Sequence, residues 1–160
     1  WTISNITAGK PDQIQAVINA NLFPRLICLL ESQDFGVKKE ACWAVCNATH
    51  GGTVEQIGFL ITNGVIKPIV DLLLGPDSDL VMVALDTLEN LLRAGHRGSG
   101  ENPVGCLVEE AGGIDQIEEL TIHDDDEVSH KASVLIDMYF GEEEEKSEWF
   151  PMEQSGFQLY

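Results

Sequence analysis

The sequence predicts an all-α fold in which short helical repeats stack into a solenoid. Residues 56–73 align without gaps on residues 13–30, and apolar residues recur there at helical intervals. Trp1 and Trp43, 42 residues apart, are each followed four positions later by Asn. A repeat of about 42 to 43 residues, with two short helices and one longer helix, is typical of such arrays.

The first part of the chain reads as one helix and then a complete repeat. Gly9 and Pro11 form a stop signal after an opening helix. Because no cap precedes Trp1, the sequence looks like a piece of a longer protein. The helices expected next run from Asp12 to the break at Asn21, from Leu22 to Leu30, and from about Gly36 to Thr49, closed by Gly51-Gly52.

The same order of elements is expected twice more. The third helix of the second copy should run from about Asp79 to Arg93. The third copy is looser: it begins near Val104, breaks at Gly112-Gly113 and ends with a helix from Val128 to Phe140. The recurring Leu and Ile positions are assigned to the core, because each unit buries its apolar face against its neighbours.

The helical pattern ends at about Gly141. We therefore divide the chain into a repeat array, residues 1–141, and an acidic and aromatic tail, residues 142–160. The tail begins with Glu142 to Glu145 and shows no helical period. Its aromatic residues leave docking onto the array open as an alternative, but we expect a flexible segment.

Charge restricts the possible partners. The chain holds 27 acidic and 9 basic residues, a formal net charge of −18. Such a field repels the phosphate backbone of a nucleic acid and attracts a cationic ligand. The alternative is a charge that serves solubility and is concentrated in the tail. Both interpretations remain open at this point.

Two further observations concern the compartment. No apolar run approaches the ~20 residues of a membrane span, so no membrane contact is expected. The four cysteines, Cys28, Cys42, Cys46 and Cys106, lack the paired spacing of a disulfide scaffold or a zinc site. With no secretory leader visible, a reducing compartment such as the cytosol or nucleus is favoured.

The Trp and Asn of each pair should share one helix face, because positions i and i+4 lie side by side. A single Trp at helical spacing is more often core than surface. Asn, however, is hard to satisfy inside an apolar core, and here it recurs beside Trp in repeat register. The two pairs, Trp1/Asn5 and Trp43/Asn47, therefore favour a binding surface on the third helices.

Several segments resemble the C-terminal armadillo repeats of the importin α family, the adaptors that carry nuclear localisation signals. The resemblance covers nearly the whole chain up to about Gly141. It implies an all-α, right-handed superhelical solenoid of about three armadillo repeats, the first represented only by its last helix. The segments that carry it are Trp1–Gly9, Lys39–Thr49, Gly51–Gly52, Glu109–Gly113 and Tyr139–Phe140.

The resemblance implies a peptide-binding site, the family's minor site for localisation signals. Lysine or arginine stems would lie between indoles on the concave face, and asparagines would hold the peptide backbone. Ser4 and Glu40 would be supporting contacts, and Cys46 departs from the small hydroxyl usual in the family. The site residues carried over are Trp1, Ser4, Asn5, Glu40, Trp43 and Asn47.

The next repeat is expected to lack an aromatic slot. Leu85 stands where a Trp is expected, with Glu89 and Asn90 as the nearest polar candidates. In the family such terminal repeats serve a nuclear export receptor and a nucleoporin, while importin β engages a basic segment that this sequence does not contain. An armadillo scaffold for folded partners is therefore the alternative function. Shuttling between cytoplasm and nucleus is the implied localisation.

Enzymatic and metal functions are not expected. No nucleophile, base and orienting group form a plausible set. The histidines share no ligand spacing, so no metal or other cofactor is expected.

Overall fold

The computed structural model describes residues 1–96 and 102–141, and these fold into α-helices with no strand among them. The all-α prediction is confirmed. The helices are α1 (Thr2–Thr7), α2 (Pro11–Asn19), α3 (Phe23–Leu29), α4 (Phe35–Gly51), α5 (Val54–Thr62), α6 (Ile66–Leu72), α7 (Ser78–Gly95), α8 (Pro103–Glu110), α9 (Gly113–Leu120) and α10 (Asp126–Tyr139).

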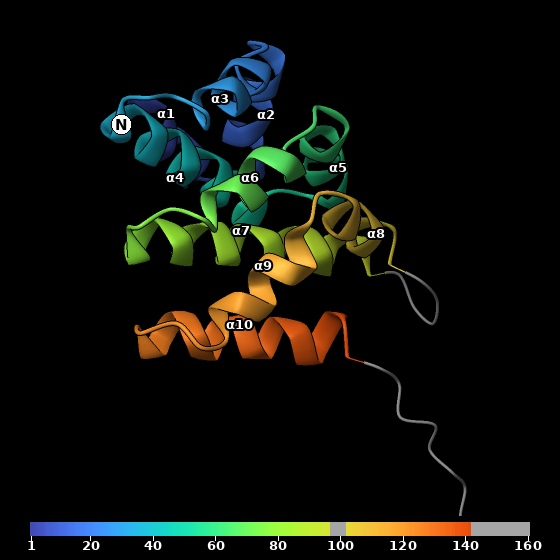
Figure 1. The fold of residues 1–160 in the computed structure, drawn as a ribbon. Helices are drawn as coiled ribbons and strands as arrows, with labels where there is room; N and C mark the ends of the chain where they lie inside the picture. The colour runs from blue at the N-terminus through green and yellow to red at the C-terminus, as the bar shows by residue number, and fades with distance from the viewer. Residues whose placement is uncertain (97–101, 142–160) are drawn as a thin grey trace, which may run out of the picture.

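The helices form three triplets, α2–α4, α5–α7 and α8–α10, and α1 acts as the last helix of a preceding unit. The long third helices stack on one another: α4 packs against α1 and α7, and α7 packs against α10. Figure 1 shows α7 and α10 as two successive layers, with α4 and α1 beyond them. The chain is therefore the solenoid expected from its internal repeat. The assignment of residues 142–160 to a separate tail lies outside the described residues and stays a prediction.

An aspartate caps each of the three complete third helices. Asp34 accepts a hydrogen bond from the backbone N–H of Val37 at 3.0 Å, and Asp77 does the same for Leu80 at 2.8 Å. Asp125 accepts from the first turn of α10. Such caps satisfy N–H groups that have no partner within the helix. They explain why these helices begin slightly before the positions expected from apolar periodicity.

Each triplet turns between its first and second helix through one residue with positive φ. These residues are Asn21 (φ 54°), Gly64 (φ 78°) and Gly112 (φ 77°). Glycine enters this left-handed region without strain, and asparagine tolerates it better than most residues. The break expected at Asn21 is therefore a backbone requirement of the repeat, met by an unusual residue in the first copy.

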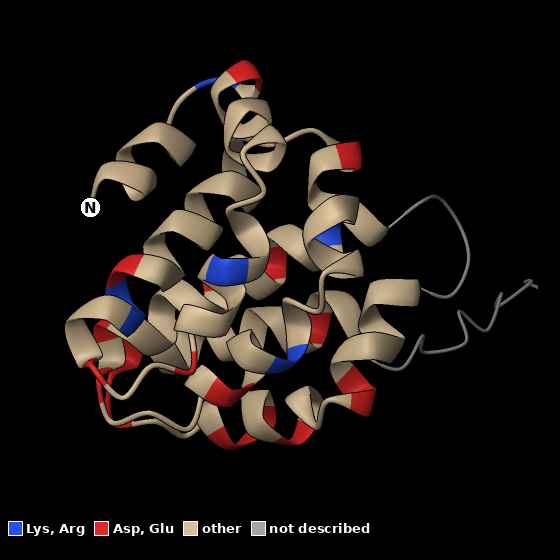
Figure 2. Cartoon of the chain, turned by 90° about the horizontal axis from the view of Figure 1, so that it is seen from above, with Lys and Arg blue, Asp and Glu red and all other residues tan. Residues whose placement is uncertain are grey.

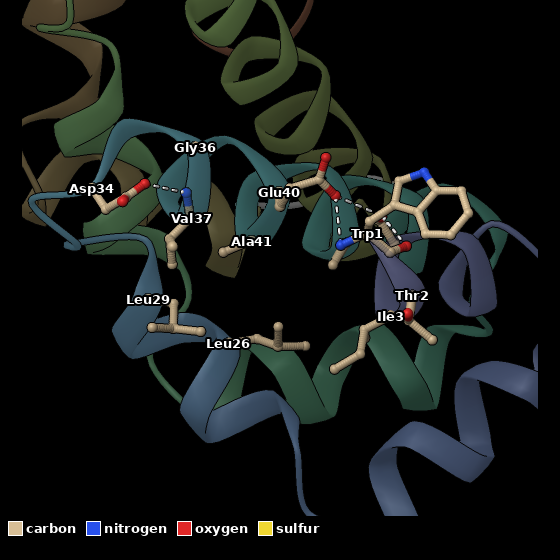
Figure 3. A pocket seen from close by; sticks show the side chains of 12 residues that line it. Trp1, Thr2, Ile3, Leu26, Leu29, Asp34, Gly36, Val37, Glu40 and Ala41 are labelled. Atoms are coloured by element: carbon tan, nitrogen blue, oxygen red, sulfur yellow. Dashed lines mark hydrogen bonds and ion pairs between the residues drawn. The ribbon is translucent and has the colours of Figure 1, made fainter.

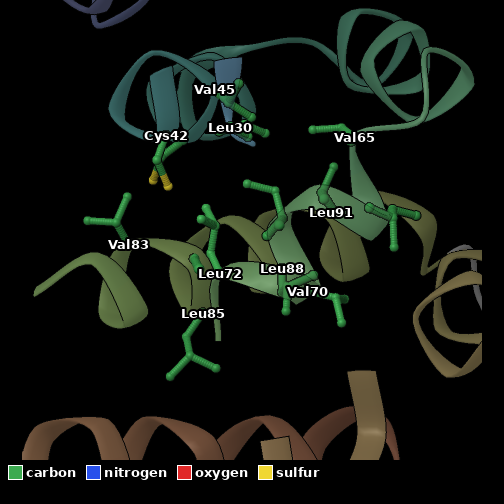
Figure 4. Close-up of a cluster of buried hydrophobic side chains, with 14 of the residues drawn as sticks. Leu30, Cys42, Val45, Val65, Val70, Leu72, Val83, Leu85, Leu88 and Leu91 are labelled. Carbon is green, nitrogen blue, oxygen red and sulfur yellow. The ribbon is translucent and has the colours of Figure 1, made fainter. Parts of the chain in front are cut away.

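The core is a continuous series of aliphatic layers between helices. Figure 4 shows side chains of α4 and α7 meeting between the two helices, with residues of the shorter helices completing the layer. Val45, Leu88 and Leu91 are fully buried, as are Ile14 and Leu60, which stand at two of the recurring aliphatic positions. The assignment of the recurring aliphatic residues to the core is thus confirmed for most of them, and Leu29, at the repeat position of the buried Leu72, is an exposed exception. None of the described helices has the length and apolar character needed to cross a bilayer.

Truncation of the buried Leu88 tests this packing. We expect Leu88→Ala to lower the free energy of unfolding by about 2–5 kcal/mol, because the α4–α7 layer cannot close over the lost atoms. Leu74→Ala is the matched control, since the Leu74 side chain is 66% exposed. Urea denaturation followed by circular dichroism measures both. Equal effects of the two substitutions would contradict the layered core.

Candidate functional site

Both predicted tryptophans lie at the surface. Trp1 is 81% exposed and Trp43 is 41% exposed, so neither belongs to the core. Asn5 is exposed as well, whereas Asn47 is half-buried. Trp1 is the N-cap residue of α1, Asn5 lies within α1, and Trp43 and Asn47 lie within α4, which packs against α1. The exposure of both tryptophans therefore agrees with their interpretation as surface residues in repeat register.

Ser4 and Glu40 meet at the junction of α1 and α4. The Ser4 hydroxyl lies 3.0 Å from Glu40 Oε2 and 2.8 Å from the carbonyl oxygen of Trp1. Glu40 Oε2 also lies 2.9 Å from the backbone nitrogen of Trp1. Glu40 is thus directed toward α1, on the Trp1 side of the junction (Figure 3).

Asn47 also joins the two helices. Its amide nitrogen donates a hydrogen bond to the backbone carbonyl oxygen of Ser4 at 3.0 Å. A helix carbonyl can accept this additional bond through its second lone pair. Half of the Asn47 carboxamide is therefore engaged within the stack. Among the described residues, its side-chain oxygen forms no hydrogen bond.

Trp1 borders an open cavity of about 570 Å³ between α1, α3 and α4. Figure 3 shows aliphatic side chains along its wall, among them Ile3, Leu26 and Leu29. Glu40 supplies an acidic group at the same cavity. Trp1 thus combines an exposed indole with an apolar floor and a nearby acidic group, while a second carboxylate, Asp34, lines the same cavity.

Trp43 lies between two further cavities on the α7 side. One, of about 350 Å³, is lined by Trp43, Asn47, Asp86 and Glu89, together with Cys46, His50, Asn90 and Arg93. The other, of about 370 Å³, extends toward the beginning of α10 and contains Asp79, Asp86, Asp125 and Glu127. Carboxylates therefore outnumber basic groups beside the indole, although Lys39 and Arg93 line the same two cavities and Lys131 pairs with Asp86 and Glu89. An acidic surface of this kind suits a cationic side chain.

The expectation for the next repeat is wrong in one residue. Leu85 is fully buried, so it does not occupy the surface position of Trp43. The aligned repeats are offset by 43 residues, which places Asp86 at the Trp43 position and Asn90 at the Asn47 position. The offset of 42 between the two tryptophans is the reason for the error. Asp86 lines the cavity beside Trp43 and was not among the residues predicted from the sequence.

Asn90 repeats the structural contact of Asn47. Its amide nitrogen lies 3.2 Å from the hydroxyl oxygen of Thr49 on α4, and its oxygen accepts a hydrogen bond from Arg93 at 2.7 Å. Asn90 is buried, in contrast to Asn5. The recurring asparagine thus becomes progressively more engaged within the stack from α1 to α7.

The negative charge belongs mainly to the repeats. Residues 142–160 contain six of the 27 acidic residues and one of the nine basic residues. Figure 2 shows acidic positions distributed over many helices of the array, with basic positions far fewer. A charge concentrated in the tail is therefore not the explanation for the acidic composition. A cationic partner would meet a negative potential at the array itself.

A model of the armadillo/beta-catenin-like repeat matches residues 10–50 and 53–93, and a model of the atypical Arm repeat matches residues 102–152. The chain belongs to the armadillo-repeat family. The first two matches cover α2–α4 and α5–α7, which are the two complete triplets with the clearest internal similarity.

The curated relatives of this armadillo chain are importin alpha subunits. It is 46% identical to importin subunit alpha-4 of Arabidopsis thaliana, over 91% of this chain and 28% of that protein. It is 47% identical to importin subunit alpha-1b of Oryza sativa subsp. japonica, over 90% of this chain and 36% of that protein. The chain thus spans about a third of the length of these relatives.

Solved structures with the same fold include designed armadillo repeat proteins. One of them, in complex with the peptide (KR)4, is 34% identical to this chain, with a TM-score of 0.75 over 86% of this chain and 54% of that one. Another, computationally designed for modular peptide recognition, is 31% identical, with a TM-score of 0.76 over 86% of this chain and 55% of that one.

The other candidate chemistries find no support in the described part of the armadillo array. No group of three or more His, Cys, Asp or Glu side chains is placed there to hold a metal ion. Burial raises the pKa of the Cys42 thiol, and it also raises that of Cys46, although a hydrogen bond with Thr87 opposes it. Both thiols therefore favour the neutral form, which is the less reactive one.

Thiol labelling tests this assignment. In the native protein we expect iodoacetamide to modify the exposed Cys28 first, and Cys42 and Cys46 only after unfolding, because burial both blocks access and disfavours the thiolate. Mass spectrometry of the digested protein measures the order, with labelling in urea as the control. Rapid native labelling of Cys42 would show that α4 is not packed as described.

Proposed function

We propose that this chain is part of a nuclear import adaptor and binds Lys/Arg-rich localisation peptides along its third helices. The observation that carries the proposal is the pair of repeat-related, exposed indoles on an acidic array, Trp1 at the N-cap of α1 and Trp43 on α4. The relatives named importin alpha and the neighbour in complex with (KR)4 support the same ligand chemistry.

The indole of Trp43 supplies the central contact. The alkyl stem of a peptide lysine or arginine lies along the ring, and its cationic head gains from the ring face. Asp79 lines the adjoining cavity and provides a carboxylate near the head group. Trp1 provides the equivalent surface one repeat earlier, with Ser4 and Glu40 beside it.

The asparagines hold the peptide backbone. The side chain of Asn5 is exposed and is engaged in no hydrogen bond among the described residues, so it can both donate and accept. Asn47 has committed its amide nitrogen to Ser4, and its oxygen accepts a peptide N–H. Two backbone contacts one repeat apart favour an extended peptide.

The larger protein is proposed to shuttle between cytoplasm and nucleus. By family resemblance its partners include importin β, a nuclear export receptor and nucleoporins, in addition to the cargo peptide. Binding of nucleic acid is disfavoured by the charge of −18. The array functions as a binding scaffold, and no catalytic role is proposed for it.

Removal of the Trp43 indole tests the site. We expect Trp43→Ala to weaken binding of (KR)4 by about 5- to 30-fold, which corresponds to the loss of ~1–2 kcal/mol of ring and stem contacts. Isothermal titration calorimetry measures the affinity. Phe35→Ala is the matched control, because Phe35 is an aromatic residue of the same helix, is 49% exposed and lines neither cavity beside Trp43.

Unchanged affinity in Trp43→Ala and Trp1→Ala would eliminate the slot mechanism. The alternative, a scaffold whose terminal repeats bind folded partners, would then be preferred. Equal losses in Trp43→Ala and Phe35→Ala would point to a general effect on α4 and would also count against the site.

Salt provides an independent test. The affinity for (KR)4 should fall by roughly tenfold between about 0.05 M and about 0.5 M NaCl, because part of the attraction is between exposed charges and is screened. Titrations at several salt concentrations measure the slope, with an uncharged eight-residue peptide of alternating Gln and Ser as the control. A salt-independent affinity would contradict recognition of the peptide's cations.

A further inference from the structure

Lys131 of α10 reaches across to two carboxylates of α7. Its Nζ lies 2.7 Å from Asp86 Oδ1 and 2.5 Å from Glu89 Oε2. The Lys131 side chain is only 22% exposed, so this ammonium is largely enclosed between the two helices. Figure 1 shows α7 and α10 as adjacent layers, and the two helices are in contact.

The two carboxylates lie beside Trp43 and Asn47 on the surface of the third helices, which we call the cation-binding wall. Asp86 stands at the repeat position of Trp43, and Glu89 stands at that of Cys46. Both line the cavity that Trp43 and Asn47 also line. An acidic pair therefore lies one repeat beyond the last indole, where the next cationic side chain of an extended peptide would arrive.

We propose that Lys131 is a specificity-determining residue that ends the cation-binding wall, because it occupies the Asp86/Glu89 pair from within the chain. This inference rests on the proposed function and deepens it. A bound peptide makes its cationic contacts at the indoles of α1 and α4. A further peptide Lys or Arg that reaches α7 finds the carboxylates of Asp86 and Glu89 already paired with Lys131.

Electrostatics supports the occupation of this pair. Burial lowers the pKa of Lys131, but its hydrogen bonds and charge interactions with Asp86 and Glu89 outweigh burial and raise that pKa overall. The lysine therefore stays charged. To displace it, a peptide cation would have to leave an ammonium enclosed and unpaired, which is costly.

The spacing determines the peptides for the test. Packed helices lie ~8–10 Å apart, and three extended residues span about 10 Å. We would therefore extend (KR)4 at both ends by three residues, with the cation or its neutral substitute outermost. One peptide carries Gly-Gly-Lys arms, and the matched peptide carries Gly-Gly-Gln arms of equal length.

The experiment compares the affinity ratio of these two peptides in the wild-type chain and in Lys131→Met. In Lys131→Met the two carboxylates are unpaired, so the preference for the lysine arms should increase by about three- to fivefold over that of the wild type, the range for a partly exposed ion pair. Calorimetry measures each affinity, and a thermal midpoint is recorded for every variant.

Two further variants make the result specific. Lys67→Met removes the same single charge from an exposed pair with Asp71 on α6, so its ratio should equal that of the wild type. In Asp86→Asn/Glu89→Gln/Lys131→Met the acidic pair is neutralised, and the gain should disappear. Lys131→Gln, which keeps a polar group between the helices, replaces Lys131→Met if the latter does not fold.

Equal ratios in Lys131→Met, Lys67→Met and the wild type would overturn the proposal. It would also be overturned if Lys131→Met weakened binding of every peptide in step with a lower thermal midpoint, since Lys131 would then serve only to hold α10 on α7. Failure of the wild-type chain to bind (KR)4 at all would instead reject the proposed function. Normal binding with unchanged ratios would reject only the role of Lys131.

Discussion

The structure depends on the stacking of its third helices, because each buries one face against the helix before it and another against the helix after it. Aliphatic layers such as that between α4 and α7 supply most of the stabilisation. A polar contact accompanies each junction: Asn47 with the Ser4 backbone, Asn90 with Thr49, and Lys131 with Asp86 and Glu89. These directional contacts favour one register of the helices and thereby fix which side chains remain exposed.

Much of the fold could be predicted because short sequence patterns within each repeat identify its helices and turns. The aliphatic spacing of each copy identifies its helices, and Asn21 or glycine identifies the turn between the first two helices. Helix ends were less certain. They depend on caps such as that of Asp34, whose side chain decides whether the next few N–H groups are satisfied. The tail beyond Gly141 carries no such periodic signal.

The site was partly predictable for the same reason. A Trp followed by Asn in two copies indicated a surface, and the exposure of both tryptophans agrees with it. The position equivalent to Trp43 in the next repeat was not predictable, because an alignment error of one residue rotates the side chain by about 100° around the helix axis. That difference separates the buried Leu85 from Asp86 on the wall. The partner of Asp86 could not be predicted either, since it comes from a helix in the least regular copy.

Indoles and carboxylates recognise cations at different costs to the folded chain. An exposed indole such as Trp43 is tolerated without a ligand, because its ring is neutral and the residue is only partly exposed. Two neighbouring carboxylates repel each other until a cation separates them. A cation beside Asp86 and Glu89 therefore stabilises this part of the surface when no peptide is bound. Lys131 of α10 supplies this cation and stabilises the α7–α10 junction without a ligand. The same contact removes the Asp86/Glu89 pair from the surface available to a peptide.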